Sequence, residues 1–446
     1  MELGKSRSLC PICLKEIDAS IIQDDGRVFI SRECAAHGLF VDPHLYEDPV
    51  IYKALSNMDC GGDDVLPDTL VFHTTPACNM DCQFCPIPGE MRSGEGPEIG
   101  EIMDEVSRFH GSTIFLCGGE PTIRGDLPEI VGKISGAGKN VLVFTNGLRL
   151  ADRKNVDSLK ATGLTQVILS FSTFQEEKDI KVYGSRVTSL KLKALENLKA
   201  TLTPTGFSFL VFKDINEDEV DKVIGYAVDN REWVKSICFQ VVWRPSERDS
   251  SMVKQKGIID LVRKSAGIDV EDFIECTVFG STVSEIFRRI TGRGGRVYSR
   301  CELRCQSWVS DGRLVPLSGM IDLKTVNESL RRINSRLKGS AARKIGVMIL
   351  FFPYTELLKS FIFNRDFRNF CLSRFSGMLS GIVHGRMFRE SLGKDMLGFM
   401  VGRYYTRYNI DLGLADTCRY CRSPEGNDIS YCICDMIGWT ENKQTA

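Results

Sequence analysis

Between residues 69 and 243, short apolar runs alternate with longer amphipathic stretches. The short runs are rich in β-branched and aromatic residues and predict strands at Thr69–Thr75, Thr113–Cys117, Asn140–Thr145, Gln166–Ser172, Phe207–Phe212 and Ser236–Val242. The longer stretches repeat their apolar residues at the spacing of one helix face, as in Glu98–Phe109, Leu127–Ser135, Leu190–Leu202 and Glu217–Asn230. Repeated strand–helix units predict a parallel α/β sheet, either doubly wound or a partial barrel.

The composition is that of a folded protein rather than a disordered tail or a coiled coil. The chain has 446 residues, of which 43% are hydrophobic and 26% charged. Its most apolar stretch, Val347–Phe363, is interrupted by Pro353, Glu356 and Lys359, so we expect no spanning helix. The chain opens without a secretory signal pattern, which predicts a cytoplasmic location. There the 17 cysteines are expected as metal ligands or free thiols rather than disulfides.

Three cysteines lie directly after the first predicted strand. Cys78, Cys82 and Cys85 have the spacing C-x3-C-x2-C. Three thiolates this close suit a [4Fe–4S] cluster and leave one iron open for another ligand. A structural zinc site is the weaker alternative, because it wants four protein ligands and no cysteine or histidine follows nearby.

The next two predicted strands end in polar motifs. Cys117-Gly118-Gly119-Glu120-Pro121 ends the second strand, and Val143-Phe144-Thr145-Asn146-Gly147 ends the third. Paired glycines let the backbone approach a ligand, and Glu120 offers a carboxylate to an amino group. The carboxyl ends of successive parallel strands are where βα-barrels place their chemistry. Cys117 is expected to be a small buried apolar residue.

The cysteine motif with Phe84 before its last cysteine, followed one βα unit later by Gly-Gly-Glu-Pro, resembles the radical S-adenosylmethionine (SAM) superfamily over Cys78–Trp243. The resemblance implies a partial (β/α)6 TIM barrel. It implies that the three cysteines hold a [4Fe–4S] cluster whose open iron binds the methionine amino and carboxylate groups of SAM. It further implies amino-group contacts from Gly118, Gly119 and Glu120, and ribose contacts from Ser170 and Ser172. Plain strand-end hydroxyls are the alternative for these two serines.

The resemblance also implies the reaction. One electron, from a donor such as ferredoxin or flavodoxin, would cleave SAM to a 5′-deoxyadenosyl radical, which abstracts hydrogen from an unactivated C–H bond. A non-catalytic iron–sulfur electron carrier is the competing hypothesis. It is disfavoured because a carrier has no use for an open iron beside Gly-Gly-Glu-Pro.

A second set of metal ligands brackets a predicted hairpin near the start of the chain. Residues 21–32 predict a hairpin around Asp24-Asp25-Gly26. Cys10, Cys13 and Cys34 lie around it, with either His37 or Cys60 as the fourth ligand. Four cysteines would favour a rubredoxin-like iron, and three with a histidine would favour zinc. A structural role is the default, with a redox relay as the alternative.

Six more cysteines lie towards the end of the chain: Cys301, Cys305, Cys418, Cys421, Cys432 and Cys434. One [4Fe–4S] cluster needs four ligands and two need eight, so we predict one complete auxiliary cluster. Residues 308–316 predict a hairpin with its turn at Asp311-Gly312. Cys238, Cys276 and Cys371 are expected to be ordinary reduced thiols.

Between these cysteines lies a basic, phenylalanine-rich segment, Lys324–Asn409. It carries 16 Lys and Arg against 5 Asp and Glu, and nine of the 25 phenylalanines. Basic and aromatic residues together suit RNA or an anionic membrane surface. The aliphatic runs favour lipid over nucleic acid. The alternative to a binding role is an ordinary helical cap, with the aromatic residues in its core and a solvated basic face.

Details outside the core are similar to the archaeal tetraether lipid synthase group, which includes pterin methylases. They are Asp59-Cys60-Gly61, Phe239-Gln240, Met320-Ile321-Asp322 and Asn409-Ile410-Asp411-Leu412, together with the N-terminal ligands. The chain departs from that group in two ways. It lacks the group's extra cysteines and histidine around Asp59–Gly61, and Cys421 and Cys434 match no position of the group. The resemblance implies hydrogen abstraction from a lipid tail, with a pterin or a peptide as the alternative substrate.

The chain is therefore expected to have four parts. Residues 1–66 form a rubredoxin-like or zinc-knuckle domain, 67–245 the partial barrel, 246–300 bridging helices, and 301–446 an auxiliary-cluster domain with the basic helical insert. The expected cofactors are SAM, a [4Fe–4S] cluster, an auxiliary iron–sulfur cluster and one zinc or iron ion. The expected partners are a lipid or small-molecule substrate and an electron donor, with peripheral contact to the inner face of a membrane as an option and no nucleic acid.

Overall fold

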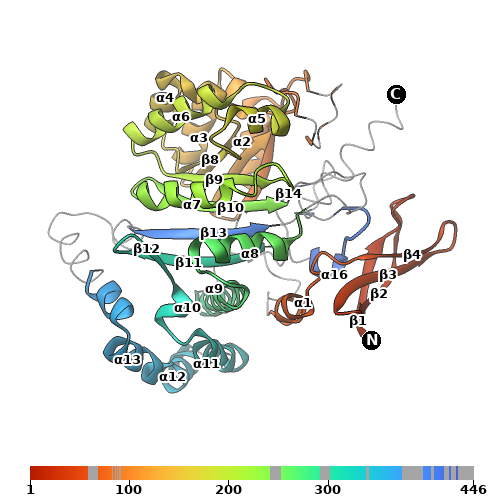
Figure 1. Ribbon diagram of the computed structural model, residues 1–446, viewed down its shortest axis with the longest axis vertical. Coiled ribbons are helices and arrows are strands. Elements are labelled where there is room, and N and C mark those ends of the chain that lie inside the picture. The colour runs from red at the N-terminus through yellow and green to blue at the C-terminus, as the bar shows by residue number, and fades with distance from the viewer. Residues whose placement is uncertain are drawn as a thin grey trace.

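The computed structural model describes residues 1–58, 69–82, 84–85, 87, 89, 92–241, 253–291, 302–337, 341–373, 395–402, 406–415, 421–422 and 428–429. A nine-stranded sheet dominates it, in the order β12-β11-β13-β10-β9-β8-β7-β6-β5 (Figure 1). A four-stranded sheet formed by the N-terminal residues lies beside it.

Six parallel strands in sequence order form the barrel part of the sheet: β5 (Thr69–Thr75), β6 (Thr113–Gly118), β7 (Asn140–Thr145), β8 (Gln166–Ser170), β9 (Thr205–Val211) and β10 (Val234–Val241). The helices between them are α2 (Ile99–Arg108), α3 (Leu127–Gly136), α4 (Arg153–Ala161), α5 (Glu176–Tyr183), α6 (Thr188–Ala200) and α7 (Glu219–Asp229). All six predicted strands are present, and the partial barrel is confirmed. The fourth strand ends at Ser170, two residues earlier than expected.

The sheet continues past β10 with strands from the segment assigned to the C-terminal domain. β13 (Met396–Gly402) pairs parallel with β10, and β11 (Glu302–Ser310) pairs antiparallel with β13. β12 (Arg313–Pro316) forms the edge, joined to β11 by the predicted Asp311-Gly312 turn, whose two residues have φ of 50° and 74°. Leu397, Phe399 and Val401 alternate along β13 and are fully buried. The sequence analysis missed β13 because it lies within the basic segment and its partners are distant in sequence.

Helices cover the outer face of this extension. α8 (Gln255–Ala266) and α9 (Val270–Thr291) occupy the segment predicted as bridging helices, and α10 (Leu317–Met320) and α11 (Leu323–Arg336) follow the edge strand. α12 (Ala341–Phe351) and α13 (Tyr354–Phe363) extend beyond α11 (Figure 1). Among the described helices, none has both the length and the apolar content needed to span a bilayer.

The N-terminal sheet consists of β1 (Glu2–Leu9), β2 (Glu16–Asp24), β3 (Arg27–Cys34) and β4 (Gly38–Pro43), followed by α1 (Pro49–Ser56). Only its β2–β3 hairpin was predicted. The sheet is joined to α16 (Leu412–Ala415) and the residues before it: His44 Nε2 lies 3.1 Å from Asp411 Oδ2, and the Arg32 guanidinium donates to the Tyr408 carbonyl at 2.8 Å. His44, Asp411 and Arg32 are buried, so the two ends of the chain share one interior.

Candidate active site and metal centre

The three central cysteines lie on the loop after β5. Cys78 and Cys82 pack against a small apolar cluster that includes Met80 and Tyr183. Arg92 holds the loop: its carbonyl accepts a hydrogen bond from Cys78 N at 3.1 Å, and its guanidinium pairs with Asp81. The Cys85 amide donates to the Cys82 carbonyl at 3.1 Å, which turns the chain between the second and third thiols.

The loop environment favours thiols over thiolates unless a cation is bound. Burial raises the pKa of Cys82 to about 12, and the neighbouring Cys85 and Cys78 add to the shift. Burial also raises the pKa of Cys78. A metal ion or cluster supplies the positive charge that deprotonates such thiols. Three soft donors on one loop, in partly apolar surroundings, fit an iron–sulfur cluster.

Glu120 is buried just after β6, and its two carboxylate oxygens accept different numbers of hydrogen bonds. Its Oε1 accepts from Thr122 N at 3.0 Å, Thr122 Oγ1 at 2.5 Å and Thr145 Oγ1 at 2.7 Å. Its Oε2 accepts from Asn146 N alone, at 2.6 Å. Burial raises the pKa of Glu120, although these hydrogen bonds oppose the shift. Oε1 is therefore saturated, whereas Oε2 keeps lone pairs for an ammonium group.

The two glycines before Glu120 touch the cysteine loop through the backbone. The Gly119 amide donates to the Thr75 carbonyl at 2.6 Å, and the Glu120 amide donates to the Ala77 carbonyl at 2.8 Å. A Cβ on Gly119 would lie 2.1 Å from the Ala77 carbonyl oxygen, and Gly118 has a φ of +120°. Neither position admits a side chain without moving the loop that carries Cys78.

Ser170 and Ser172, predicted as ribose contacts, both lie near the hydroxyl of Tyr183. Ser172 is fully buried, and its hydroxyl lies 2.8 Å from Tyr183 Oη; Ser170 Oγ lies 3.3 Å from the same oxygen. The Tyr183 ring packs against Phe84 of the cysteine loop, at 5.8 Å between ring centres. The two serines therefore position Tyr183 under that loop, and their contact with a ribose stays a prediction.

The sequence analysis missed Lys191, which is fully buried on α6. Its Nζ donates to the Ser170 carbonyl at 2.7 Å and lies 3.9 Å from the centre of the Tyr183 ring. Its positive charge acts on the Cys82 thiol and lowers its pKa, against the larger effect of burial. The sequence shows it only as one of several lysines on an amphipathic helix, so no local signal identifies it.

One face of the sheet carries a row of side chains that begins beside this loop. The strand registers place Ser170, Ser208, Cys238, Met400 and Arg304 next to one another across five strands. The following row holds Leu210, Gln240, Gly402 and Glu302. We call these two rows the inner face. The rows that point the other way, such as Phe209, Phe239, Val401 and Leu303, are fully buried on the side that α9 covers.

Polar groups on the inner face bond to one another, across strands at Ser208 and Gln240 and within β11 at Glu302 and Arg304. The Ser208 hydroxyl donates to Gln240 Oε1 at 3.1 Å. The Arg304 guanidinium donates twice to Glu302 Oε2, at 3.2 and 2.6 Å. Both side chains of this ion pair are partly buried, so the inner face is charged rather than purely apolar.

The N-terminal ligands form a compact metal site. One ligand atom each from Cys10, Cys13, Cys34 and His37 lies within 4.8 Å of all the others. His37 Nδ1 lies 3.5 Å from the sulfurs of Cys10 and of Cys34. The structure thus brings His37 to this set, and Cys60 lies outside the described residues. Three thiolates and one imidazole fit tetrahedral Zn²⁺.

Replacing His37 should release this metal. We expect His37→Ala to weaken zinc binding by more than the roughly 10- to 100-fold that loss of an outer-shell partner costs, because a direct ligand is removed. Metal analysis after dialysis against a mild chelator measures the effect, with the exposed His110→Ala as the matched control. Equal zinc retention by both variants, or iron in place of zinc, would contradict the assignment.

The C-terminal cysteines are only partly described. Cys305 lies on β11 with its sulfur 3.7 Å from that of Cys276 on α9, and both are buried. Cys276, expected to be an ordinary thiol, is thus the described neighbour of Cys305. Cys301, Cys418, Cys432 and Cys434 lie outside the described residues, and of Cys421 only the backbone, in the short strand β14 (Cys421–Arg422), is described. The auxiliary cluster stays a prediction.

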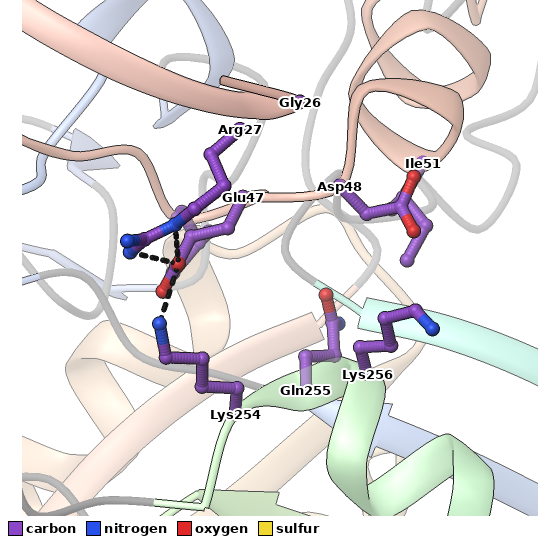
Figure 2. A pocket seen from close by; sticks show the side chains of 9 residues that line it. Gly26, Arg27, Glu47, Asp48, Ile51, Lys254, Gln255 and Lys256 are labelled. Atoms are coloured by element: carbon purple, nitrogen blue, oxygen red, sulfur yellow. Dashed lines mark hydrogen bonds and ion pairs between the residues drawn. The ribbon is translucent and has the colours of Figure 1, made fainter. Parts of the chain in front are cut away.

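A separate cavity of about 280 Å³ lies between the N-terminal sheet, α1 and α8 (Figure 2). Glu47 lines this cavity, and its carboxylate accepts hydrogen bonds from Arg27 Nε at 2.9 Å and from Lys254 Nζ at 2.7 Å. These pairs tie the N-terminal region to the core. None of the predicted site residues lines this cavity.

Two family models match the chain. The model described as the radical SAM superfamily matches residues 72–227, which hold the cysteine loop and Gly118–Glu120. Residues 72–227 therefore form a radical SAM domain. The model described as the HMPTM N-terminal zinc ribbon domain matches residues 2–44, which hold the Cys10–His37 metal site.

Relatives of this radical SAM enzyme include a 7,8-dihydro-6-hydroxymethylpterin dimethyltransferase from Methanocaldococcus jannaschii. The two are 28% identical over 379 residues, which is 74% of each chain. A probable GTP 3′,8-cyclase from Thermoplasma volcanium is 30% identical over 211 residues, which cover 46% of this chain and 63% of the cyclase. The enzyme thus spans less than two thirds of the cyclase, and its likeness to the pterin enzyme extends beyond the core.

Solved structures of radical SAM proteins match more distantly. The hydrogenase maturase HydG from Carboxydothermus hydrogenoformans has a TM-score of 0.38 and 17% identity, over 48% of this chain and 55% of that one. SuiB from Streptococcus suis, bound to S-adenosylmethionine, has a TM-score of 0.34 and 14% identity, over 42% and 41%.

The radical SAM family implies SAM and a [4Fe–4S] cluster, and the described residues fit both. The cysteine loop offers three thiols to the cluster, and Glu120 Oε2 keeps acceptor capacity for an amino group. When bound, the two cofactors supply a carbon-centred radical that abstracts hydrogen. The chain contributes the ligands, the buried carboxylate and the support of the loop by Arg92 and Tyr183.

Proposed function

We propose that this enzyme uses radical SAM chemistry to methylate a small, polar, fused-ring substrate of the reduced pterin class. The observation that carries the proposal is the inner face, whose polar groups run from Ser170, beside the cysteine loop, to the Glu302–Arg304 pair. A substrate close to the cysteine loop would lie against these groups.

A pterin suits such a surface better than a hydrocarbon chain does. Its ring edge carries several hydrogen-bond donors and acceptors, which can pair with Gln240, Glu302 and Arg304. A lipid tail would displace water from these groups without replacing its hydrogen bonds, which is costly for the charged Glu302–Arg304 pair. Phe115 on β6 and Phe144 on β7, whose ring centres lie 6.2 Å apart, add aromatic surface for a flat ring.

The relationship to the pterin dimethyltransferase of Methanocaldococcus jannaschii supports the same substrate class. The alignment with that relative covers 74% of this chain, which extends well beyond the barrel. The expectation of a lipid-tail substrate came from the resemblance to the tetraether lipid synthase group, with the basic, phenylalanine-rich segment as additional support. Phe370 of that segment contacts Trp308, which pairs with Met396 at the start of β13, so it lies at the end of the strands away from the cysteine loop.

The test is anaerobic turnover of the reconstituted enzyme with SAM and a low-potential reductant. We expect 6-hydroxymethyl-7,8-dihydropterin to stimulate 5′-deoxyadenosine formation and to gain methyl groups by mass spectrometry. Arg304→Gln should raise the KM for the pterin about tenfold, equivalent to about 1.4 kcal/mol, because it removes a charged partner from the inner face. The exposed Arg313→Gln on the next strand is the matched control.

Stimulation by a lipid extract and not by the pterin would contradict the proposal. An equal KM in the Arg304 and Arg313 variants would remove the inner face from the substrate site. Thermal unfolding of both variants separates a binding defect from a folding defect.

A further inference from the structure

Helix α13 is apolar in composition, yet only Leu357 among its residues packs, partly buried, against the main core. Among its ten described residues, YTELLKSFIF, none is buried. A helix of this composition normally packs an apolar stripe onto a core. Here Tyr354, Leu358, Phe361 and Ile362 repeat at the spacing of one helix face, and all four are exposed.

Further exposed apolar side chains lie at the end of α13 and on the preceding helix α12. Leu358 is 60% exposed, Phe363 82%, and Leu350 on α12 75%. We call the group formed by Ile345, Leu350, Tyr354, Leu358, Ile362 and Phe363 the α12–α13 surface. Large exposed apolar patches on folded proteins mark sites of interaction.

Two exposed basic residues, Lys359 and Arg365, accompany the apolar side chains of α13. Lys359 lies between Leu358 and Phe361 and, among the described residues, pairs with Glu356 on its own helix. Arg365 is exposed just beyond the end of α13. Apolar side chains rimmed by basic ones match the boundary of an anionic bilayer, where acyl chains meet phosphate groups.

The position of the surface argues against an electron-donor protein as its occupant. Asn364 Nδ2 donates to the Gly319 carbonyl at 2.9 Å, and Phe370 packs on Trp308, 5.8 Å between ring centres. These contacts fix α13 at the amino-terminal end of the parallel strands, whereas the cysteine loop follows the carboxyl end of β5 (Figure 1). A donor docked here would be remote from the thiols it must serve.

The chemistry of the surface also argues against RNA. Stacking of bases requires aromatic or guanidinium planes. Ile345, Leu350, Leu358 and Ile362 offer none, although they contribute much of the exposed apolar area.

We propose that the α12–α13 surface docks this enzyme on an anionic lipid bilayer. The short helix α13 would lie in the plane of the membrane, with Leu358 and Phe363 among the upper acyl segments and Lys359 and Arg365 at lipid phosphates. Docking of this kind fixes where the enzyme works and leaves the inner face free for a polar substrate. It is independent of the identity of that substrate.

Cosedimentation of the full-length holoenzyme with vesicles tests the proposal. We expect binding to vesicles of equal parts phosphatidylglycerol and phosphatidylcholine, and at least about tenfold weaker binding to pure phosphatidylcholine, because the basic rim loses its partners. The double variant Leu358→Glu/Phe363→Glu should bind the anionic vesicles at least about tenfold more weakly. Both positions are exposed, so the fold and SAM cleavage in solution should be unchanged.

The matched control is Leu39→Glu, on the N-terminal sheet, where Leu39 is 65% exposed. It should bind anionic vesicles as the wild type does. The proposal is overturned if the wild type stays in solution with anionic vesicles, or if both variants bind them equally. A vesicle-independent dimer that the double variant converts to a monomer would also overturn it, since a second copy would then cover the surface.

Discussion

Cys82→Ala should reduce 5′-deoxyadenosine formation by about 1,000-fold or more, equivalent to about 4 kcal/mol or more in barrier height. Cys82 is the middle one of the three predicted ligands in the loop, and it packs against the apolar cluster that includes Met80. With two thiols left, the cluster loses a ligand and SAM has no ordered iron to bind. Iron and sulfide content, measured together with deoxyadenosine after anaerobic reconstitution, shows whether the cluster itself is lost.

The control for this variant is Cys371→Ala. Cys371 is a partly exposed thiol in the segment after α13, outside every predicted ligand set. It should retain the wild-type iron content and rate. SAM cleavage by Cys82→Ala at the wild-type rate would refute the assignment of the cysteine loop as the cluster site.

Glu120→Gln should weaken SAM binding by about 10- to 100-fold, or about 1.4–2.8 kcal/mol, while leaving the cluster in place. The substitution keeps the shape of the side chain but removes the charge opposite the amino group. It also turns an amide donor towards either Asn146 N or the three donors at Oε1. Calorimetric titration of the reconstituted protein with SAM measures the loss directly.

Glu129→Gln is the matched control for Glu120. Glu129 lies on α3 with its side chain 58% exposed and pairs with Lys133 on the same helix. It should bind SAM as the wild type does. Equal affinities for the two variants would show that Glu120 serves only to tie the ends of β6 and β7 together through Thr122, Thr145 and Asn146.

The local sequence predicted the barrel well. β5 and β7 have the predicted bounds, and the other four strands differ from them by a few residues at their ends. Each of these strands buries at least one face, so it is a compact apolar run between polar loops. The cysteine loop and the Gly-Gly-Glu motif were equally visible, because their ligands are close together in sequence.

Pairings between distant residues were not predictable from local pattern. β13 joins β10 across more than 150 residues, and nothing in its own sequence selects that partner. Ser172 looks like a strand-end hydroxyl, and nothing in the local sequence shows its contact with Tyr183. Cys305 was paired by spacing with Cys301, but the strand that carries it turns its sulfur towards Cys276 on α9.

The sequence by itself predicted the radical SAM core, its six strands, the cluster ligands and the N-terminal metal ligands, because each depends on neighbours along the chain. Only the tertiary structure decided that His37 lies with the three N-terminal cysteines, that the inner face carries polar groups among apolar ones, and that α13 leaves most of its apolar residues exposed. These properties depend on which elements pack together, and packing sums many weak contacts between residues far apart in sequence.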